Sequence, residues 1–174
     1  MRSLIQSWFR GADEPRGEPA ALRALIDALD RLEPDHARHL AQFAYLLGRV
    51  AHADQHVSPE ETRTMEALVE REGALPPEQA MLVVSLARSS NLMFGGTDNF
   101  LVARDFAMRA TSVQCLALVR CLFAVAAAEG RISIAEEREI QRIARELKVE
   151  HADLVGLRVE YRAHLPGLAD PQST

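Results

Sequence analysis

VAHADQHVSPEE (residues 50–61) and VAAAEGRISIAE (residues 125–136) are two copies of one pattern, 75 positions apart in a chain of 174 residues. Five of the twelve aligned positions are identical. In each copy an acid is followed by two variable residues, an aliphatic residue, a serine and, three positions after the serine, a glutamate. A serine and a glutamate at this spacing predict a capping box, in which each side chain satisfies a free backbone amide of the other residue at a helix N-terminus. The pattern therefore predicts a helix, an acidic loop and a second helix, twice.

Apolar residues recur at intervals of three and four before each loop, which is the spacing of one face of an α-helix. These residues are Phe43, Leu47 and Val50 in the first copy and Leu118, Leu122 and Val125 in the second. Aromatic residues make up only 5% of the chain, and runs of alternating β-branched residues are absent. We therefore expect an all-α fold without a sheet: a compact bundle of several helices, with two pseudo-symmetric helix, acidic loop, helix repeats whose apolar faces point inward.

Breaks in the helical pattern divide the chain into three parts. We expect an amphipathic segment and a Gly, Pro and charge-rich linker over residues 1–17, one helical domain over 18–164 and a disordered tail over 165–174. The repeats lie near residues 40–88 and 115–162. Helices are expected over residues 19–32, 35–53, 59–73, 76–88, 98–109, 134–147 and 150–162.

Composition excludes several classes of protein. Twenty Lys and Arg against 25 Asp and Glu give a formal net charge of −5, and the basic residues are scattered singly, so we expect no nucleic acid partner. The most apolar stretch, residues 113–130, is too short for a membrane span and contains Arg120. Cys115 and Cys121 fall on different faces of a predicted helix, so we expect two reduced core thiols in a cytoplasmic protein.

The first ten residues lack the apolar core and the cleavage site of a secretory signal. They carry Leu4, Ile5, Trp8 and Phe9 at helical spacing. This segment could pack on its own domain, or it could touch a partner or a membrane surface.

The acids of the two loops are the candidates for chemistry. Asp54 and Glu129 lie in the last turn of a helix, where the macrodipole disfavours a carboxylate. One interpretation is structural: each acid accepts hydrogen bonds from loop amides or from the start of the next helix. The other is a divalent cation site for calcium, magnesium or manganese, formed by Asp54 with Glu61 or Glu60 and by Glu129 with Glu136 or Glu137.

Two further features each have a structural and a functional interpretation. His52 and His56 have the spacing of a zinc-binding H-E-x-x-H motif, but Ala53 stands where its glutamate would be, so we expect no zinc hydrolase site. Leu92, Met93 and Phe94 are apolar residues in a predicted loop. They could form a lid on the core or a surface that binds a protein partner.

VAHADQHVSPEETRTMEALVER (residues 50–71) and FAVAAAEGRISIAEEREIQRIARELKV (residues 123–149) resemble the signature of the TerB (tellurite-resistance B) family. In that signature a helix runs into A-D/E-G-x-I-S-x-x-E, and a helix of the type I-x-x-I-A-x-x-L follows. The similarity covers residues 36–162, and the second copy matches more closely because the first has Gln55 where glycine is usual.

The resemblance implies an all-helical TerB-like domain connected with tellurite resistance and stress responses. Similar domains occur in membrane-anchored J-domain co-chaperones, but no His-Pro-Asp tripeptide is present here. Some members of the family are thought to bind metal through the loop acids, which here are Asp54, Glu61, Glu129 and Glu136.

These observations lead to one main expectation and two alternatives. The main one is a non-enzymatic stress-response module that acts by binding a protein partner; a divalent cation at the paired loops and a position near a membrane stay open. One alternative is a structural domain whose partner is a second copy of itself. The other is an enzyme that uses the clustered carboxylates with a metal, which would need a concave pocket lined by both loops.

Overall fold

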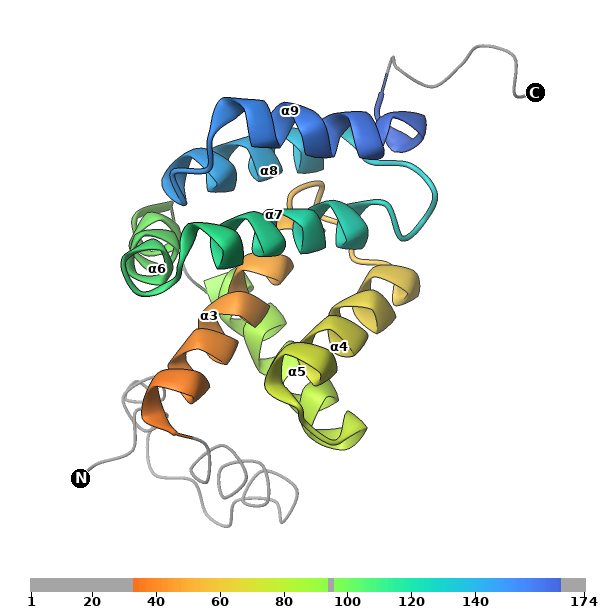
Figure 1. Ribbon diagram of the computed structural model, residues 1–174. Helices are drawn as coiled ribbons and strands as arrows, with labels where there is room; N and C mark the ends of the chain where they lie inside the picture. The colour runs from red at the N-terminus through yellow and green to blue at the C-terminus, as the bar shows by residue number, and fades with distance from the viewer. Residues whose placement is uncertain (1–32, 94–95, 167–174) are drawn as a thin grey trace.

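The computed structural model describes residues 33–93 and 96–166, without the side chains of residues 90–98. In these residues every regular element is helical, which confirms the predicted all-α class. The predicted helix over residues 19–32, the segment before it and the tail from residue 167 lie outside the described residues. The elements, shown in Figure 1, are α3 (Pro34–Ala51), α4 (Pro59–Gly73), α5 (Pro77–Met93), α6 (Gly96–Arg109), α7 (Ser112–Ala126), α8 (Ile134–Glu146), α9 (His151–Glu160) and a 3-10 turn, η1 (Arg162–His164).

Helix α3 is the centre of the domain. Pro34 suits the first turn of a helix because its missing amide would have no partner there. From Gln42 to Ala51 every residue is buried, so this half of α3 is enclosed on all sides. It packs against α4, α5, α6, α7 and α8. The core of the second repeat is therefore built against a helix of the first.

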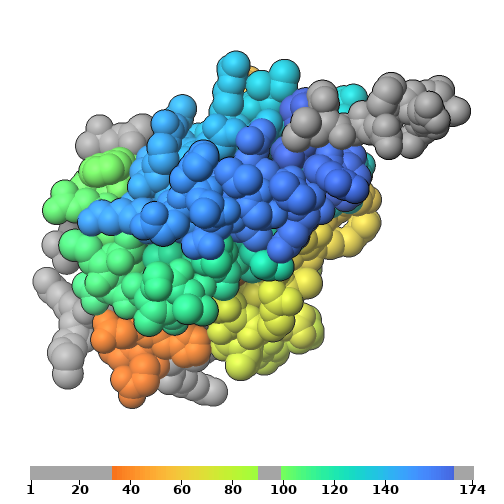
Figure 2. All heavy atoms as spheres, turned by 45° about the horizontal axis from the view of Figure 1, so that its top comes forward, coloured from red at the N-terminus to blue at the C-terminus, as the bar shows by residue number. Residues whose placement is uncertain are grey.

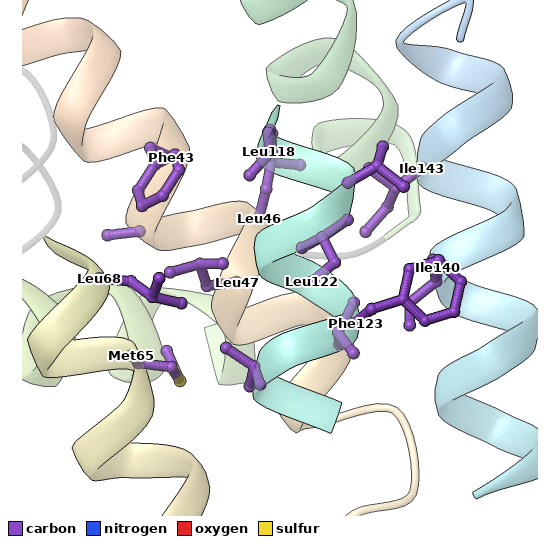
Figure 3. Close-up of a cluster of buried hydrophobic side chains, with 14 of the residues drawn as sticks. Phe43, Leu46, Leu47, Met65, Leu68, Leu118, Leu122, Phe123, Ile140 and Ile143 are labelled. Atoms are coloured by element: carbon purple, nitrogen blue, oxygen red, sulfur yellow. The ribbon is translucent and has the colours of Figure 1, made fainter. Parts of the chain in front are cut away.

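The core lies where α3, α4, α7 and α8 converge (Figure 3). The two apolar faces predicted to point inward are both buried, which confirms that part of the packing. Helix α9 packs on α7, and α8 and α9 together form one outer face of the molecule (Figure 2). Close packing also explains Gly73 at the end of α4: a Cβ atom there would lie 2.8 Å from Cδ2 of Leu40.

The predicted end of the helix over residues 76–88 was wrong. Helix α5 continues to Met93 instead of ending at Arg88, and α6 begins at Gly96 instead of at residue 98. The hydroxyl of Ser89 donates to the Ser85 carbonyl one turn earlier, so this serine remains in the helix instead of ending it. Most of the stretch between the helices predicted over residues 76–88 and 98–109 is therefore helical.

The two repeats are similar at their loops and differ in their third helices. Helix α5 has 17 residues and packs on both α3 and α4. Helix α9 has ten residues and packs on α7. A two-fold relation between whole repeats stays a prediction, whereas the helix, loop, helix corner occurs twice.

Candidate functional site

Both acidic loops turn through a residue with a positive φ angle. The residue is Gln55 in the first loop (φ 67°) and Gly130 in the second (φ 90°), and these positions are equivalent in the two copies. Glycine adopts such angles without steric cost, whereas a residue with a Cβ atom does not. The loop therefore has the same backbone course in both copies, and glutamine carries a conformational cost at the position where the second copy has glycine.

Both predicted capping boxes are confirmed. Glu61 Oε2 accepts a hydrogen bond from the Ser58 amide at 2.7 Å, and the Ser58 hydroxyl oxygen accepts one from the Glu61 amide at 3.0 Å. In the second copy the corresponding distances between Ser133 and Glu136 are 2.7 and 3.2 Å. Each glutamate is only 4% exposed, so the caps hold two carboxyl groups inside the protein.

The carboxyl groups of Glu61 and Glu136 meet, although they are 75 positions apart in the chain. Burial raises the pKa of Glu136 to about 7, and repulsion from Glu61 adds to the effect. Burial also raises the pKa of Glu61, and the charge of Glu129 contributes in the same direction. Two buried carboxyl groups at one cavity wall therefore disfavour carrying two negative charges together.

A cavity of about 250 Å³ lies between the two loops and contains this pair in its wall. All four acids predicted as cation ligands line it, two from each loop. Its remaining lining residues, His56, Ala126, Arg131 and Ser133, were not predicted as part of a site. The fold thus brings together the acids that the repeat places far apart in the sequence.

The alternative ligands point elsewhere. The Glu60 carboxylate lies 3.1 Å from Arg63 on the exposed side of α4. Glu137 forms an ion pair with Arg158 of α9 at 2.5 Å. Neither residue lines the cavity. The candidate cation ligands are therefore the capping glutamates, Glu61 and Glu136, and the loop acids, Asp54 and Glu129.

The four acids share a cavity without converging on one point. In the described part of the chain, no three His, Cys, Asp or Glu side chains are placed to hold one metal ion. Asp54 Oδ1 accepts a hydrogen bond from the His56 amide at 2.9 Å, a contact of the kind expected of a structural acid. A cation bound here would have to draw the exposed acids inward or reach them through water.

The second loop is attached to the end of the described chain. The Ile132 amide donates to the His164 carbonyl at 2.8 Å, and His164 Nδ1 lies 2.8 Å from the Gly130 carbonyl oxygen. The Tyr161 ring stacks on Phe123 of α7, which fixes η1 over the loop. No local pattern in the sequence indicated this contact, because it joins segments more than 30 residues apart.

Arg49 sets the position of one loop relative to the other. Its side chain is 2% exposed and lies in the last turn of α3, just before the first loop. It forms ion pairs with Glu139 at 2.6 Å and with Glu146 at 2.8 Å, both on α8, the helix that follows the second loop. The one signal in the sequence is a single arginine among the apolar residues of the second half of α3.

The remaining predicted features are placed as follows. His52 Nδ1 lies 2.8 Å from the Gly48 carbonyl of its own helix and does not share a metal site with His56 in the described structure. Cys115 and Cys121 are both free thiols, buried and half-buried respectively. The backbones of Leu92 and Met93 belong to α5, whereas Phe94 and all three side chains proposed for partner binding lie outside what the structure describes.

Comparison with known proteins identifies the family. A family model described as "Tellurite resistance protein TerB" matches residues 41–159, a range that contains both loops and all four cavity acids. No curated protein and no solved structure matches the chain. None of the helices in the described part of the chain has the length and apolar character needed to cross a membrane.

Proposed function

Because the chain belongs to the TerB family of tellurite resistance proteins, we propose that it is a non-enzymatic binding module whose acidic cavity takes up a divalent cation and thereby controls the binding of a protein partner. The observation that carries this proposal is the meeting of the two loops at one cavity lined by Asp54, Glu61, Glu129 and Glu136. The capping glutamates would hold the ion from inside, and the loop acids from the exposed side.

The chemistry of the donors supports a hard cation. Calcium, magnesium and manganese prefer carboxylate oxygens, and calcium accepts six to eight oxygen ligands in a flexible arrangement. Burial raises the pKa of Glu61 and of Glu136, so two negative charges side by side are unfavourable there. A bound cation would supply positive charge that offsets them.

The proposed link to a partner follows from the position of the cavity. The first loop joins α3 to α4 and the second joins α7 to α8, so an ion held by both would tie the two repeats together. Asp54 and Glu129 are exposed, and a shift of these residues toward an ion would change the surface that a partner meets. We expect this partner to be a protein in the cytoplasm, and a second copy of the chain is the alternative partner.

A metal-dependent enzyme is the competing function, and one observation favours it. The concave pocket lined by both loops is present, and Glu136, with its pKa of about 7, could exchange a proton with a bound molecule. The two functions differ in one measurable respect. Cation-dependent partner binding involves no turnover, whereas an enzyme converts a substrate.

Thermal unfolding tests the cation site. Metal-free protein is melted with calcium, magnesium, manganese or zinc, beside the double variant Asp54→Asn, Glu129→Gln. A cation that binds only the folded state stabilises it by about 2.7 kcal/mol at a free concentration of 100 times its Kd. We expect one ion to raise the melting temperature of the natural protein and not that of the variant.

The matched control is Glu60→Gln, Glu70→Gln, which changes the net charge equally at two exposed acids of α4 outside the cavity. This control should respond to the ion as the natural protein does. If no ion stabilises the natural protein, or if the control and the cavity variant lose the response equally, the cavity is not a cation site and its acids are structural.

A further inference from the structure

The cavity between the two loops is lined by two basic residues as well as by acids. They are His56 and Arg131, and each follows a loop acid by two positions. They lie 75 positions apart, which is the offset of the two copies, so they occupy equivalent places in the repeat. Each loop therefore brings one basic residue to the cavity together with its acids.

Arg131 brings a permanent positive charge to this cavity. A guanidinium group stays protonated under all conditions in which proteins are folded, and it pairs well with carboxylates. The neighbouring arginines Arg142 and Arg158 already have such partners, Glu139 and Glu137. Among residues 33–93 and 96–166, the side chain of Arg131 has no hydrogen bond and no ion pair.

The backbone on both sides of Arg131 is fixed. The Gly130 carbonyl oxygen lies 2.8 Å from His164 Nδ1, and the Ile132 amide donates to the His164 carbonyl at 2.8 Å. Ile132 is also fully buried in the core. The second loop thus holds Arg131 at the cavity, and its exposed side chain can turn toward the acids without any movement of the backbone.

A positive charge at this wall has two effects of opposite sign. In the metal-free protein it offsets the repulsion among the four acids of the cavity. When a cation enters, the same charge repels it, and a divalent ion is repelled twice as strongly as a monovalent ion at the same distance. The charge of Arg131 should therefore stabilise the metal-free protein and weaken the binding of a cation.

From this placement we propose that Arg131 is the resident counter-ion of the cavity, and that a cation has to compete with it for the acids. The competition rests on the cation uptake proposed above. The pairing of Arg131 with the loop acids in the metal-free protein does not.

A double-mutant cycle in the metal-free full chain tests the counter-ion. Arg131→Gln, the double variant Asp54→Asn, Glu129→Gln and the combination of all three are melted in the presence of a chelator. We expect Arg131→Gln to lower the melting temperature by about 2 °C in the natural background and to have no such effect when both loop acids are neutral. Arg131→Lys keeps the charge and should melt like the natural protein.

Calorimetric titration with calcium, magnesium or manganese alone tests the competition. For an ion that binds the natural protein, we expect Arg131→Gln to bind it about fivefold more tightly, because one repelling charge has been removed. The matched control is Arg145→Gln, which removes the same charge from an exposed residue in the last turn of α8, outside the cavity. Its Kd should equal that of the natural protein.

The outcomes separate this inference from the cation site itself. If a cation binds the natural protein and Arg131→Gln with the same Kd, the competition is overturned and the cation site remains. If the substitutions in the metal-free cycle are additive, Arg131 is not a counter-ion of the loop acids. If neither protein binds a cation, the proposed cation uptake is wrong and the competition with it, whereas the metal-free cycle still decides the counter-ion.

Discussion

The Glu136 side chain lines the cavity, and its raised pKa makes the free energy of unfolding depend on pH. Below about pH 4.5 the group is protonated in both the folded and the unfolded chain. As the pH rises toward 7, the unfolded chain loses this proton first, so the folded state loses stability over this window and does not recover it above pH 7. The buried carboxyl group of Glu136 thus destabilises the folded metal-free protein at neutral pH.

Replacing Glu136 by Gln should remove that cost while keeping the cap, because the amide oxygen can still accept the bond from Ser133. As the pH rises from 4.5 to 8, the natural protein should lose free energy of unfolding that the variant keeps. At roughly 1.4 kcal/mol per pKa unit, this difference should reach about 3 kcal/mol. Urea unfolding of both proteins at pH 5 and pH 8, without divalent cations, measures this difference. The exposed substitution Glu70→Gln is the control, and parallel pH profiles for Glu136→Gln and the natural protein would contradict the prediction.

At the scale of elements, the important contact is the one between α3 and α8 through Arg49. The guanidinium group also donates to the Asn99 carbonyl at 2.9 Å, so it is satisfied by three partners from two other segments. Glu139 and Glu146 are 13% and 12% exposed. Without the arginine, Glu146 would lose this ion pair and Glu139 would keep only its ion pair with Arg142 at 3.1 Å. A charge buried without its partner destabilises more than the intact pair stabilises.

Arg49→Met keeps most of the side-chain volume and removes the charge, and we expect it to lower the free energy of unfolding by about 3 to 5 kcal/mol. The control Arg63→Met removes an exposed ion pair with Glu60 and should cost less than about 1 kcal/mol. Adding Glu139→Gln and Glu146→Gln to Arg49→Met should restore part of the loss. Chemical denaturation at neutral pH measures all three, and an Arg49 effect no larger than the Arg63 effect would show that this network is not structural.

At the scale of the whole molecule, α3 of the first repeat packs against helices of both repeats. Because α3 packs against α4 and α5 on one side and α7 and α8 on the other, neither repeat keeps its core without it. Leu47 of α3 is fully buried among side chains of α4 and α7 (Figure 3). The domain should therefore unfold as one unit and not as two.

Leu47→Ala tests this cooperativity. We expect a loss of about 2 to 5 kcal/mol, the usual cost of a cavity at a buried leucine. Amide hydrogen exchange should then accelerate in α4 and in α8 together, and circular dichroism should show one unfolding transition. Leu154→Ala on the peripheral α9 is the comparison, since that helix packs on α7 and is joined to α8 by the ion pair between Arg158 and Glu137. Retained protection in α8 after loss of protection in α4 would mean that the repeats fold separately.

The local features of this protein were predictable from the sequence because their causes lie within a few residues. Ser58 and Ser133 cap their helices through glutamates three positions away, and the apolar faces follow the helical repeat. The same reasoning failed at Ser89, where a serine can either stay in a helix or end it, and where α5 stays helical through its packing on α3 and α4. The family resemblance rested on these local patterns and was confirmed by the match over residues 41–159.

The site itself depended on contacts between distant parts of the chain. The repeat indicated which acids could act together, but only the packing of α4 and α8 around α3 brings Glu61 to Glu136 and raises their pKa values. Arg49 and His164 became visible as supports of the loops only when their partners, 90 and 34 positions away, were in place. The physical reason is burial: capping and helical periodicity are properties of short segments, whereas desolvation of a charge depends on everything that the folded chain packs around it.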